Sequence, residues 1–351
     1  MTTPYTQIRS AIAILIALAG WVAQAQAGSM LAGRVFDAAT RSPLPGATVY
    51  LANTTVGTAA ANDGTFSLGP ILPGKYNLIA SMVGYRRFSK LVLIDGNDLA
   101  PITISLEPQA EELRPVEVTA KRSNSRIDFI EFKKAFLGQT HNSFRCTIVN
   151  VQDIFVYREG RKLHAVARKP IEVINRALGY RIYFDLAHFT MNYDSATYLL
   201  VGTPRFENLT PETFKQQTTW QRARDQAYYG SFSHFLRSLK KNALTENHFF
   251  LTDAQDHPLS ATQLFHAGND STLFYRGSMQ VVFDAEWPEA GYPIRGRSQR
   301  SELQFSGKPI VVYANGYYHD YRDVVLQGYF GWSDRMAEEV PLGFEPSSKL
   351  K

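Results

Sequence analysis

The sequence predicts a mostly β protein, with an N-terminal β-sandwich followed by an α+β domain rich in antiparallel strands. Three observations lead to this class. The 351 residues are more than one small domain needs. They include 22 Phe and 18 Tyr, which are residue types favoured in strands. Short strand-like runs separated by turn residues recur along the chain, and only two segments have a clear helical pattern.

Charge and cysteine content exclude several classes of protein. Lys and Arg number 37 and Asp and Glu number 32, and these charges are scattered along the chain. Because nucleic-acid binding normally needs a clustered basic stripe, we do not expect a nucleic-acid partner. The single cysteine rules out a disulfide framework and a multi-thiolate zinc site.

Residues 1–27 have the pattern of a secretory signal peptide. Arg9 precedes an apolar run, Ala11–Val22, and small residues follow at Ala25 and Ala27. The run is shorter than the roughly 20 residues that a membrane-spanning helix needs, which argues against an N-terminal anchor. Cleavage is expected after Ala27, with Ala25 as the alternative. We therefore expect an exported protein, periplasmic, outer-membrane-associated or secreted, with no transmembrane span in the mature chain.

Residues 28–106 contain short strand-like runs with turn chemistry between them. Such closely spaced runs predict an antiparallel sandwich. Asp63-Gly64 suits a tight hairpin turn, and Gly84 allows the chain to swing between strands. The expected strands are Leu31–Phe36, Ala47–Leu51, Gly64–Leu68, Tyr76–Met82, Phe88–Ile94 and Ile102–Leu106.

The order of residues in this region is more specific than the strand pattern. The relevant motifs are Gly33–Asp37, Pro43–Val49, Gly57-Thr58, Asn62–Leu68, Gly74–Leu78 and Val83–Tyr85. In this order they resemble the carboxypeptidase-regulatory-like domain. The resemblance implies a transthyretin-like β-sandwich of about seven strands that acts in folding and docking and carries no catalytic residues.

Four aspartates in this region have the oxygen chemistry of calcium ligands, but isolated turn aspartates usually cap their own backbone, so no metal is expected. They are Asp37, Asp63, Asp95 and Asp98.

Residues 107–125 form a polar, Pro-containing linker, and residues 126–345 form the predicted α+β domain of unknown function. A helix is expected to begin after Ser125, because Ser125 and Asp128 have capping-box spacing. Gly138 is expected to end that helix. Its apolar stripe consists of Phe129, Phe132, Phe136 and Leu137.

Strands dominate the rest of this domain, and one further helix interrupts them. Phe232, Phe235, Leu236, Leu239 and Ala243 form the apolar stripe of that helix. The expected strands are Thr147–Tyr157, Lys162–Ala167, Tyr180–Asp185, Thr197–Val201, Gln280–Ala285 and Pro309–Ala314, and Asn315-Gly316 predicts a two-residue hairpin turn.

Several landmarks in residues 126–345 resemble those of exported Bacteroidetes proteins described as carboxypeptidase-like regulatory domain-containing proteins. The landmarks are Phe136–Thr140, Cys146–Asn150, Leu178–Tyr180, Tyr228–Ser231 with His234–Arg237, and Gly328–Trp332. This resemblance implies an origin and a compartment, and it implies no activity.

The sequence contains no metallocarboxypeptidase, serine-hydrolase elbow or P-loop signature, so no catalytic, cofactor or metal residue is predicted. Cys146 is expected to be a buried small hydrophobe rather than a nucleophile. Paired carboxylates for glycoside hydrolysis stay open, because their separation is spatial. Asp185, Glu286 and Glu302 are examples of such carboxylates.

The densest polar and aromatic cluster runs from Trp220 to Arg237. One interpretation makes it a partner-binding face formed by Arg222, Arg224, Tyr228, His234 and Arg237. His234 and Arg237 lie off the apolar stripe and are expected to be partly exposed. The alternative places Trp220, Tyr229 and Phe235 in the core, with the arginines bridging surface carboxylates.

These observations predict a non-enzymatic, exported envelope protein. The sandwich would be a docking module, and the second domain would bind or scaffold an envelope protein or a glycan. The alternative is a hydrolase of unrecognised type acting on peptide or glycan. A deep pocket with a perturbed acid/base pair would favour the hydrolase, and an aromatic binding surface would favour the binding protein.

Overall fold

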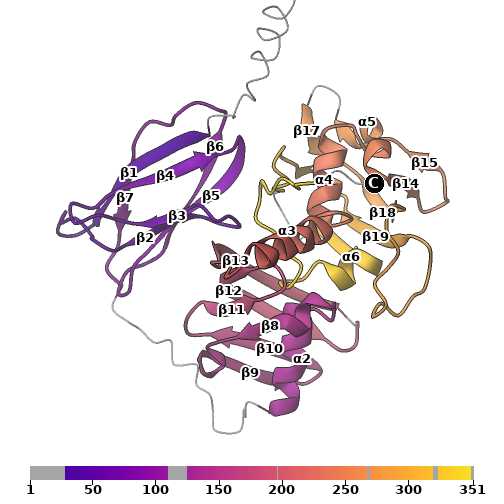
Figure 1. The fold of residues 1–351 in the computed structure, drawn as a ribbon, viewed down its shortest axis with the longest axis horizontal. Coiled ribbons are helices and arrows are strands. Elements are labelled where there is room, and N and C mark those ends of the chain that lie inside the picture. Colours follow the sequence, from indigo (N-terminus) through magenta and orange to yellow (C-terminus); the bar gives the residue numbers. More distant parts are fainter. Residues whose placement is uncertain (1–27, 110–124, 196, 267–268, 319–322, 349–351) are drawn as a thin grey trace, which may run out of the picture.

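The computed structural model describes residues 28–109, 125–195, 197–266, 269–318 and 323–348 (Figure 1). The fold is mostly β, with antiparallel sheets and a few helices, which confirms the predicted class. The predicted signal peptide and most of the predicted linker lie outside the described residues. In the described part of the chain, no helix is both long enough and apolar enough to cross a membrane.

The N-terminal part is a sandwich of two sheets, as predicted (Figure 1). One sheet contains, in spatial order, β4 (Thr65–Ile71), β1 (Ser29–Asp37) and β7 (Ile102–Leu106). The other contains β3 (Gly57–Ala59), β2 (Thr48–Leu51), β5 (Gly74–Ser81) and β6 (Phe88–Ile94). Fully buried Leu31 and Val35 of β1 belong to the same core cluster as Val49 and Leu78, so the sandwich encloses a core of its own.

Two details of the sandwich differ from the sequence prediction. β3 was not predicted, since its three residues include no buried side chain that would give a pattern. β7 pairs with β1 in parallel, although an antiparallel sandwich was expected. The reason is that β6 lies in the opposite sheet, so the chain crosses between sheets before β7, and a crossover allows parallel pairing.

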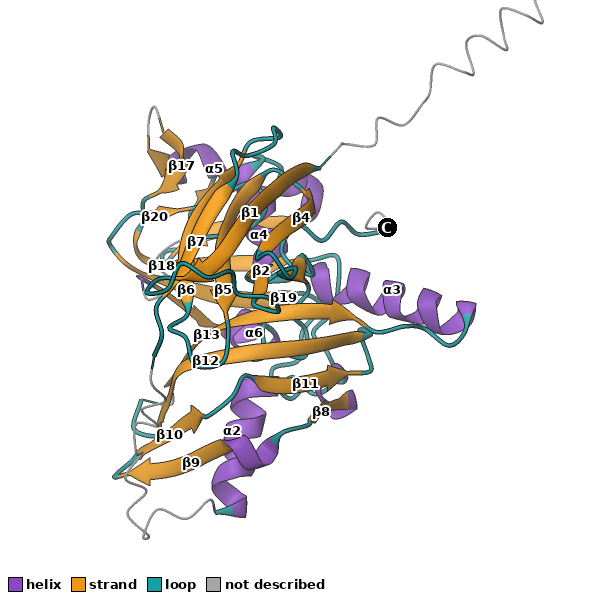
Figure 2. Cartoon of the chain, turned by 90° about the vertical axis from the view of Figure 1, so that its left-hand side faces the viewer, coloured by secondary structure: helices purple, strands orange, loops and turns teal. Residues whose placement is uncertain are grey.

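The middle part of the chain forms an antiparallel sheet covered on one face by α2 (Arg126–Leu137). Its strands are β8 (Cys146–Ile148), β9 (Ile154–Glu159), β10 (Lys162–Ala167), β11 (Ile171–Asn175), β12 (Tyr180–Asn192) and β13 (Thr197–Asn208). β12 pairs along its whole length with β13, and Figure 2 shows these two long strands side by side below the sandwich.

The predicted strand Thr147–Tyr157 was wrong in its middle. Two 3₁₀ turns, η1 (Asn142–Arg145) and η2 (Val151–Asp153), flank β8, so β8 and β9 are separate strands. The Asn150 side chain holds this break, because its Oδ1 accepts from the Glu172 amide at 2.8 Å and its Nδ2 donates to the Pro170 carbonyl at 3.0 Å.

α2 begins and ends where the sequence predicted. The Ser125 side chain accepts a hydrogen bond from the Ile127 amide, and Gly138 ends the helix with a φ of 90°. Phe132 and Phe136 are fully buried and pack edge-on against Phe189 and Phe184 of β12. These aromatic contacts anchor the helix to the sheet.

The third part contains a five-stranded sheet, a three-stranded sheet and four helices. In spatial order, the strands of the five-stranded sheet are β15 (Pro258–Leu259), β14 (Phe249–Asp253), β18 (Arg276–Phe283), β19 (Gln299–Ser306) and β21 (Val324–Gln327). Those of the three-stranded sheet are β16 (Phe265–His266), β17 (Asn269–Leu273) and β20 (Ile310–Val311). The helices are α3 (Phe214–Tyr228), α4 (Phe232–Lys240), α5 (Ala261–Leu264) and α6 (Gly328–Ser333), and the 3₁₀ turn η3 spans Thr245–Asn247.

α4 is the second predicted helix, and its apolar stripe is buried from Phe232 to Leu239. The Ser231 side chain caps it by accepting from the His234 amide at 3.1 Å. A hairpin forms at Asn315-Gly316 as predicted, but its loop has three residues rather than two, because the Tyr313 amide donates to the Tyr317 carbonyl at 2.8 Å. α3 was not predicted, since few of its positions are buried and no continuous apolar stripe marks it.

Residues 334–348, which we call the C-terminal strap, contact all three parts of the molecule. Met336 and Ala337 are buried in the core of the middle sheet, and the Asn175 side chain donates to the Ala337 carbonyl at 2.9 Å. Leu342 packs on the sandwich core and donates its amide to the Asn53 carbonyl at 2.6 Å. The strap therefore ties distant segments together.

The sandwich docks through the outer face of β2 and β5. Tyr50, Ala52 and Ile79 form a small buried cluster that lies apart from the sandwich core. The Tyr50 hydroxyl donates to Asp185 Oδ2 at 2.8 Å. Arg87 pairs with the same carboxylate at 2.8 Å, so Asp185 of β12 joins the two parts.

Candidate functional site

The structure separates the five predicted partner-binding residues. Tyr228, His234 and Arg237 come together where α3 meets α4, with the Tyr228 and His234 rings 4.9 Å apart. Arg237 lies over the Tyr228 ring at 5.3 Å. Arg224 instead stacks on Tyr180 at 4.0 Å. Arg222 is exposed on α3.

Arg224 is held by backbone atoms. Its Nε donates to the Leu178 carbonyl at 2.7 Å and its Nη2 donates to the Gly179 carbonyl at 3.0 Å. Burial lowers the pKa of this guanidinium, while the nearby Tyr180 hydroxyl opposes the shift. Arg224 thus fastens α3 to the turn before β12, and it does so through carbonyls rather than the carboxylates that the alternative interpretation expected.

The expected partial exposure of His234 and Arg237 was wrong. Their exposed fractions are 2% and 6%, because rings of neighbouring elements surround His234 and the strap covers Arg237. The Gly230 amide donates to His234 Nδ1 at 3.2 Å, so the neutral ring carries its proton on Nε2, near Asn247 Oδ1. Burial lowers the pKa of His234 to about 4.

The strap binds the cluster that was expected to receive a partner. Arg237 Nη1 donates to the Phe344 carbonyl at 2.6 Å, and its Nη2 pairs with Glu345. On α3, Asp225 accepts from the Ser347 amide at 3.0 Å, from the Ser347 hydroxyl at 2.6 Å and from the Ser348 hydroxyl at 3.0 Å. We call Arg224, Asp225, Tyr228, His234 and Arg237 the α3–α4 cluster.

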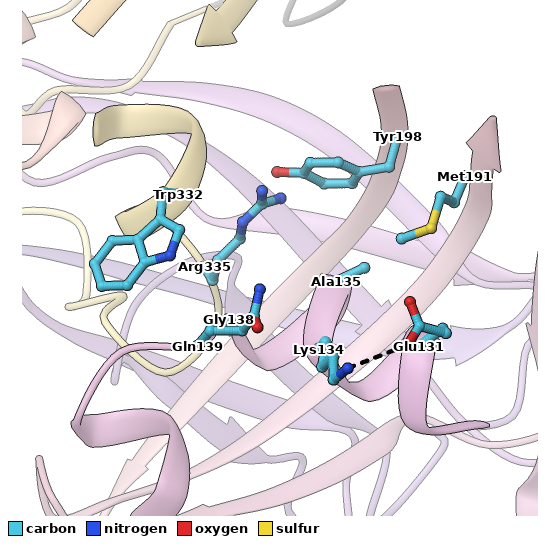
Figure 3. Close-up of a pocket in the computed structure, with 9 residues that line it drawn as sticks. All are labelled: Glu131, Lys134, Ala135, Gly138, Gln139, Met191, Tyr198, Trp332 and Arg335. Atoms are coloured by element: carbon cyan, nitrogen blue, oxygen red, sulfur yellow. Dashed lines mark hydrogen bonds and ion pairs between the residues drawn. The ribbon is translucent and has the colours of Figure 1, made fainter. Parts of the chain in front are cut away.

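A pocket of about 230 Å³ lies where α2, the β12–β13 hairpin, α6 and the strap meet (Figure 3). We call it the α2–α6 pocket. It is lined by Glu131, Lys134, Ala135, Gly138, Gln139, Met191, Tyr198, Trp332 and Arg335. These residues come from four separate stretches of the chain, so no local motif marks the pocket in the sequence.

The strap places Arg335 in this pocket. The Met336 and Ala337 amides both donate at 3.2 Å to the carbonyls of Phe136 and Leu137, at the end of α2. Gly138 allows this close approach. A Cβ at Gly138 would lie 2.9 Å from Cβ and Cγ of Arg335, and its φ of +90° also disfavours other residues.

The Arg335 guanidinium has aromatic and carbonyl contacts but no ion pair with a described residue. It lies 3.8 Å from the centroid of the Tyr198 ring, and Nη2 donates to the Gly331 carbonyl. Its Nη1 is buried and has no hydrogen-bond partner among the described residues. Burial lowers the pKa of Arg335 to about 9. Since no carboxylate compensates this charge within the described chain, the pocket is electrostatically incomplete.

The other side chains of the pocket have defined neighbours. Lys134 Nζ lies 3.2 Å from Glu131 Oε1, so these two charges pair at one end (Figure 3). Trp332 packs edge-on against Tyr292, with 5.4 Å between ring centroids, and against Tyr329 at 5.6 Å. These contacts fix the indole while part of it lines the pocket.

A second hollow, of about 510 Å³, lies on the sandwich near β1 and β4. Its two arginines already have partners. Arg41 lies over the Phe36 ring at 5.1 Å, and Arg34 approaches Asp63 at 4.0 Å. Arg41 is exposed to water, so the leftover charge of the sandwich hollow is solvated, whereas Arg335 in the α2–α6 pocket is half-buried.

The remaining candidate residues have structural contacts. Cys146 is buried, and burial raises the pKa of its thiol to about 12, in agreement with the predicted buried hydrophobe. Asp37 accepts from the amides of Ala39 and Thr40 at 2.7 and 2.9 Å, as expected for a turn aspartate. Asp63 and Asp95 likewise accept from amides two residues ahead. Asp98 differs, since it accepts from the Met30 amide of β1 at 2.7 Å.

Three solved structures illustrate what the chain is similar to. A Klebsiella pneumoniae 5-hydroxyisourate hydrolase is 20% identical, with 23% of this chain and 92% of that chain covered and a TM-score of 0.20. A group B streptococcus pilus 2b backbone protein is 17% identical, with 24% of this chain and 42% of that chain covered and a TM-score of 0.21.

A putative carbohydrate binding protein from Bacteroides uniformis is 8% identical, with 86% and 98% of the two chains covered and a TM-score of 0.20. No curated protein matches the sequence. A family model matches the N-terminal part, from β1 into the predicted linker, where the sequence motifs carried the resemblance. Residues 31–118 of this chain form a CarboxypepD_reg-like domain.

Proposed function

We propose that this protein is a non-enzymatic binding protein of the cell envelope. In this proposal the CarboxypepD_reg-like domain is a docking module, and residues 126–345 hold a ligand in the α2–α6 pocket. The observation that carries the proposal is the Arg335 guanidinium, which lines the pocket without an ion-pair partner among the described residues. Buried charges are normally paired, so an unpaired charge in a pocket favours an external ligand.

The composition of the pocket supports binding over hydrolysis. Ligand pockets combine aromatic or apolar walls with a few placed polar groups, and this pocket has Trp332, Tyr198 and Met191 beside Arg335 and Gln139. Glu131 is the acidic residue among the described residues that line the pocket, and its carboxylate is paired with Lys134. A pair of carboxylates with separated pKa values, which a hydrolase of glycans would use, is not formed by these lining residues.

The docked sandwich supports the role of a docking module. Tyr50 and Arg87 meet Asp185 of β12, and backbone hydrogen bonds join the turn after β2 to Pro204 and Phe206 of β13. The α2–α6 pocket lies on the other face of the same sheet, on the side of α2. The sandwich therefore supports the pocket-bearing sheet without covering the pocket. Location in the envelope rests on the signal-peptide pattern of residues 1–27.

Calorimetric titration of the mature chain tests the proposal. The ligand panel would contain neutral and acidic monosaccharides, disaccharides and short peptides. We expect at least one compound to bind saturably, to be recovered unchanged, and to lose tenfold or more in affinity with Trp332→Ala. Phe214→Ala is the matched control, because Phe214 is 82% exposed at the start of α3. Turnover of a bound compound would favour the hydrolase, and absence of binding across the panel would contradict the proposal.

A further inference from the structure

The buried Arg237 and the half-buried Arg224 and Arg335 differ in how their charge is balanced. Arg237 is 6% exposed and pairs with Glu345, and Arg224 donates to two carbonyls. Arg335 has one carbonyl acceptor, and its Nη1 is left without a partner among the described residues. Moving a charge out of water costs free energy that an ion pair usually offsets, so the half-buried and unpaired Arg335 favours a negative charge from outside the described chain.

The net charge of the pocket sets the charge of the missing group. Of the side chains that line it, Lys134 and Arg335 are cationic and Glu131 is anionic. Glu131 pairs with Lys134, so one positive charge is left over. A group with a single negative charge balances it, whereas a phosphate monoester would bring close to two. The guanidinium acts on this group through its positive charge, since Nη2 already donates to the Gly331 carbonyl.

The walls and size of the pocket describe the rest of the ligand. Trp332, Tyr198 and Met191 give it apolar and aromatic surfaces, and the Gln139 side chain lines it with an amide (Figure 3). Its volume of about 230 Å³ is below the roughly 300–1,000 Å³ of pockets for drug-sized ligands. A compound with one ring fits this volume, and its apolar face can pack on the indole.

We propose that the α2–α6 pocket binds a small carboxylic acid built on a single ring, with the carboxylate at Arg335 and the ring against Trp332. This inference rests on the proposed binding function and specifies its ligand class. Two sources share this chemistry, the sugar acids and the aromatic acids. The charge of Arg335 attracts the carboxylate of either acid, and the ring of the ligand, which packs against Trp332, differs between the two sources.

Matched pairs of acid and neutral amide test the inference by calorimetry on the mature chain. The pairs are D-glucuronate with D-glucuronamide and benzoate with benzamide. We expect the acid of at least one pair to bind ten times or more tightly than its amide, and this preference to weaken as salt rises. Preference for glucuronate over benzoate would assign sugar acids, and the reverse would assign aromatic acids.

Two variants and a control locate the interaction. Arg335→Gln should remove the preference for the acid, and Trp332→Ala should weaken acid and amide alike. Arg222→Gln is the control, since Arg222 is an exposed arginine on α3 that should leave binding unchanged. If Arg335→Gln loses the folded state, the acid-over-amide ratio and its salt dependence in the wild-type chain still decide the question.

The outcomes separate this inference from the proposed function. Equal binding of acid and amide, abolished by Trp332→Ala, would overturn the carboxylate inference while the binding function stands. Binding of an acid that Arg335→Gln leaves unchanged would also overturn it. If neither acid binds but a neutral sugar or peptide does, the ligand class is wrong and the function stands. If no compound binds, both fail.

Discussion

Two arginines, the buried Arg237 and the half-buried Arg335, distinguish the two regions of this protein that have binding chemistry. Arg237 belongs to the α3–α4 cluster, where its Nη1 donates to the Phe344 carbonyl and its Nη2 pairs with Glu345. Arg335 belongs to the α2–α6 pocket, where the described chain supplies one carbonyl and no carboxylate. The charge of Arg237 is paired within the molecule, whereas that of Arg335 has no ion-pair partner among the described residues. Each side chain also has one buried nitrogen without a hydrogen-bond partner there, Nε in Arg237 and Nη1 in Arg335.

The C-terminal strap is responsible for both arrangements. Phe344, Glu345, Ser347 and Ser348 satisfy the α3–α4 cluster, while Arg335, from the start of the same strap, brings an uncompensated charge to the α2–α6 pocket. A dense cluster of arginines and aromatic residues is therefore an ambiguous sign of partner binding. What distinguishes the two regions is whether the chain itself fills the site.

The largest expected effect is the loss of packing in the α3–α4 region, which provides a reference for the polar contacts. Phe235 is 1% exposed and packs against Phe249 and Phe330. Phe235→Ala should lower the free energy of unfolding by about 3–5 kcal/mol, because it removes a buried ring and leaves a cavity. Chemical denaturation measures this. A loss below about 1 kcal/mol would mean that α4 is not part of a well-packed core.

The next effect concerns the pH dependence that His234 gives to the α3–α4 cluster. Its pKa is lowered to about 4 in the folded state, against about 6.5 when unfolded. The unfolded chain therefore binds the extra proton between these values, so stability is full above pH 6.5 and falls as pH drops toward 4. The free energy of unfolding falls by on the order of 3 kcal/mol over this pH range.

His234→Asn is the matched variant for this pH dependence, since it keeps a polar side chain and removes the titration. Denaturation midpoints at pH 7.5, 5.5 and 4.5 should fall less steeply in the variant than in the wild-type chain. Parallel pH profiles would show that His234 is not buried as a neutral ring.

Arg237→Ala should weaken the attachment of the strap. The change removes the hydrogen bond to Phe344 and the ion pair to Glu345, and we expect a loss of about 1–3 kcal/mol. The loss is limited because Glu345 is 64% exposed and regains water. Arg222→Ala, on the exposed side of α3, should stay within about 0.5 kcal/mol of wild type. Equal effects of the two variants would remove the distinction between a strap-bound and a free arginine.

Arg335→Gln should have the smallest effect on stability, at most about 1 kcal/mol. It loses the contacts with Gly331 and Tyr198 but also removes a buried charge that no described residue neutralises, and the two changes oppose each other. Denaturation without ligand measures this. A loss as large as that of Arg237→Ala would show that the pocket arginine has an internal partner, which contradicts the comparison.

The sequence was sufficient for features with local causes. Helix α2 follows from the Ser125 cap, the phenylalanine stripe and Gly138. The Asn315-Gly316 hairpin follows from its turn residues. The sandwich follows from its strand spacing and motif order, and the match at residues 31–118 agrees with it. Each of these depends on neighbouring residues, so a linear pattern contains the information.

Two local predictions failed because the structure there depends on contacts with residues distant in the sequence. The strand Thr147–Tyr157 was predicted from its apolar content, but the break depends on hydrogen bonds between Asn150 and residues about 20 positions away. Helix α3 lacks an apolar stripe because Asp225 and Arg224 use its buried side for polar contacts with other segments. Patterns of apolar residues do not report such contacts.

By itself, the sequence determined the mostly β class, the sandwich, the positions of α2 and α4, and the residue types of the α3–α4 cluster. Only the tertiary structure decided that His234 and Arg237 are buried, since the strap that covers Arg237 lies more than 100 positions away. It also decided the α2–α6 pocket, whose residues span Glu131 to Arg335. Burial and charge compensation depend on which distant segments meet in space, and that is settled only when the whole chain has packed.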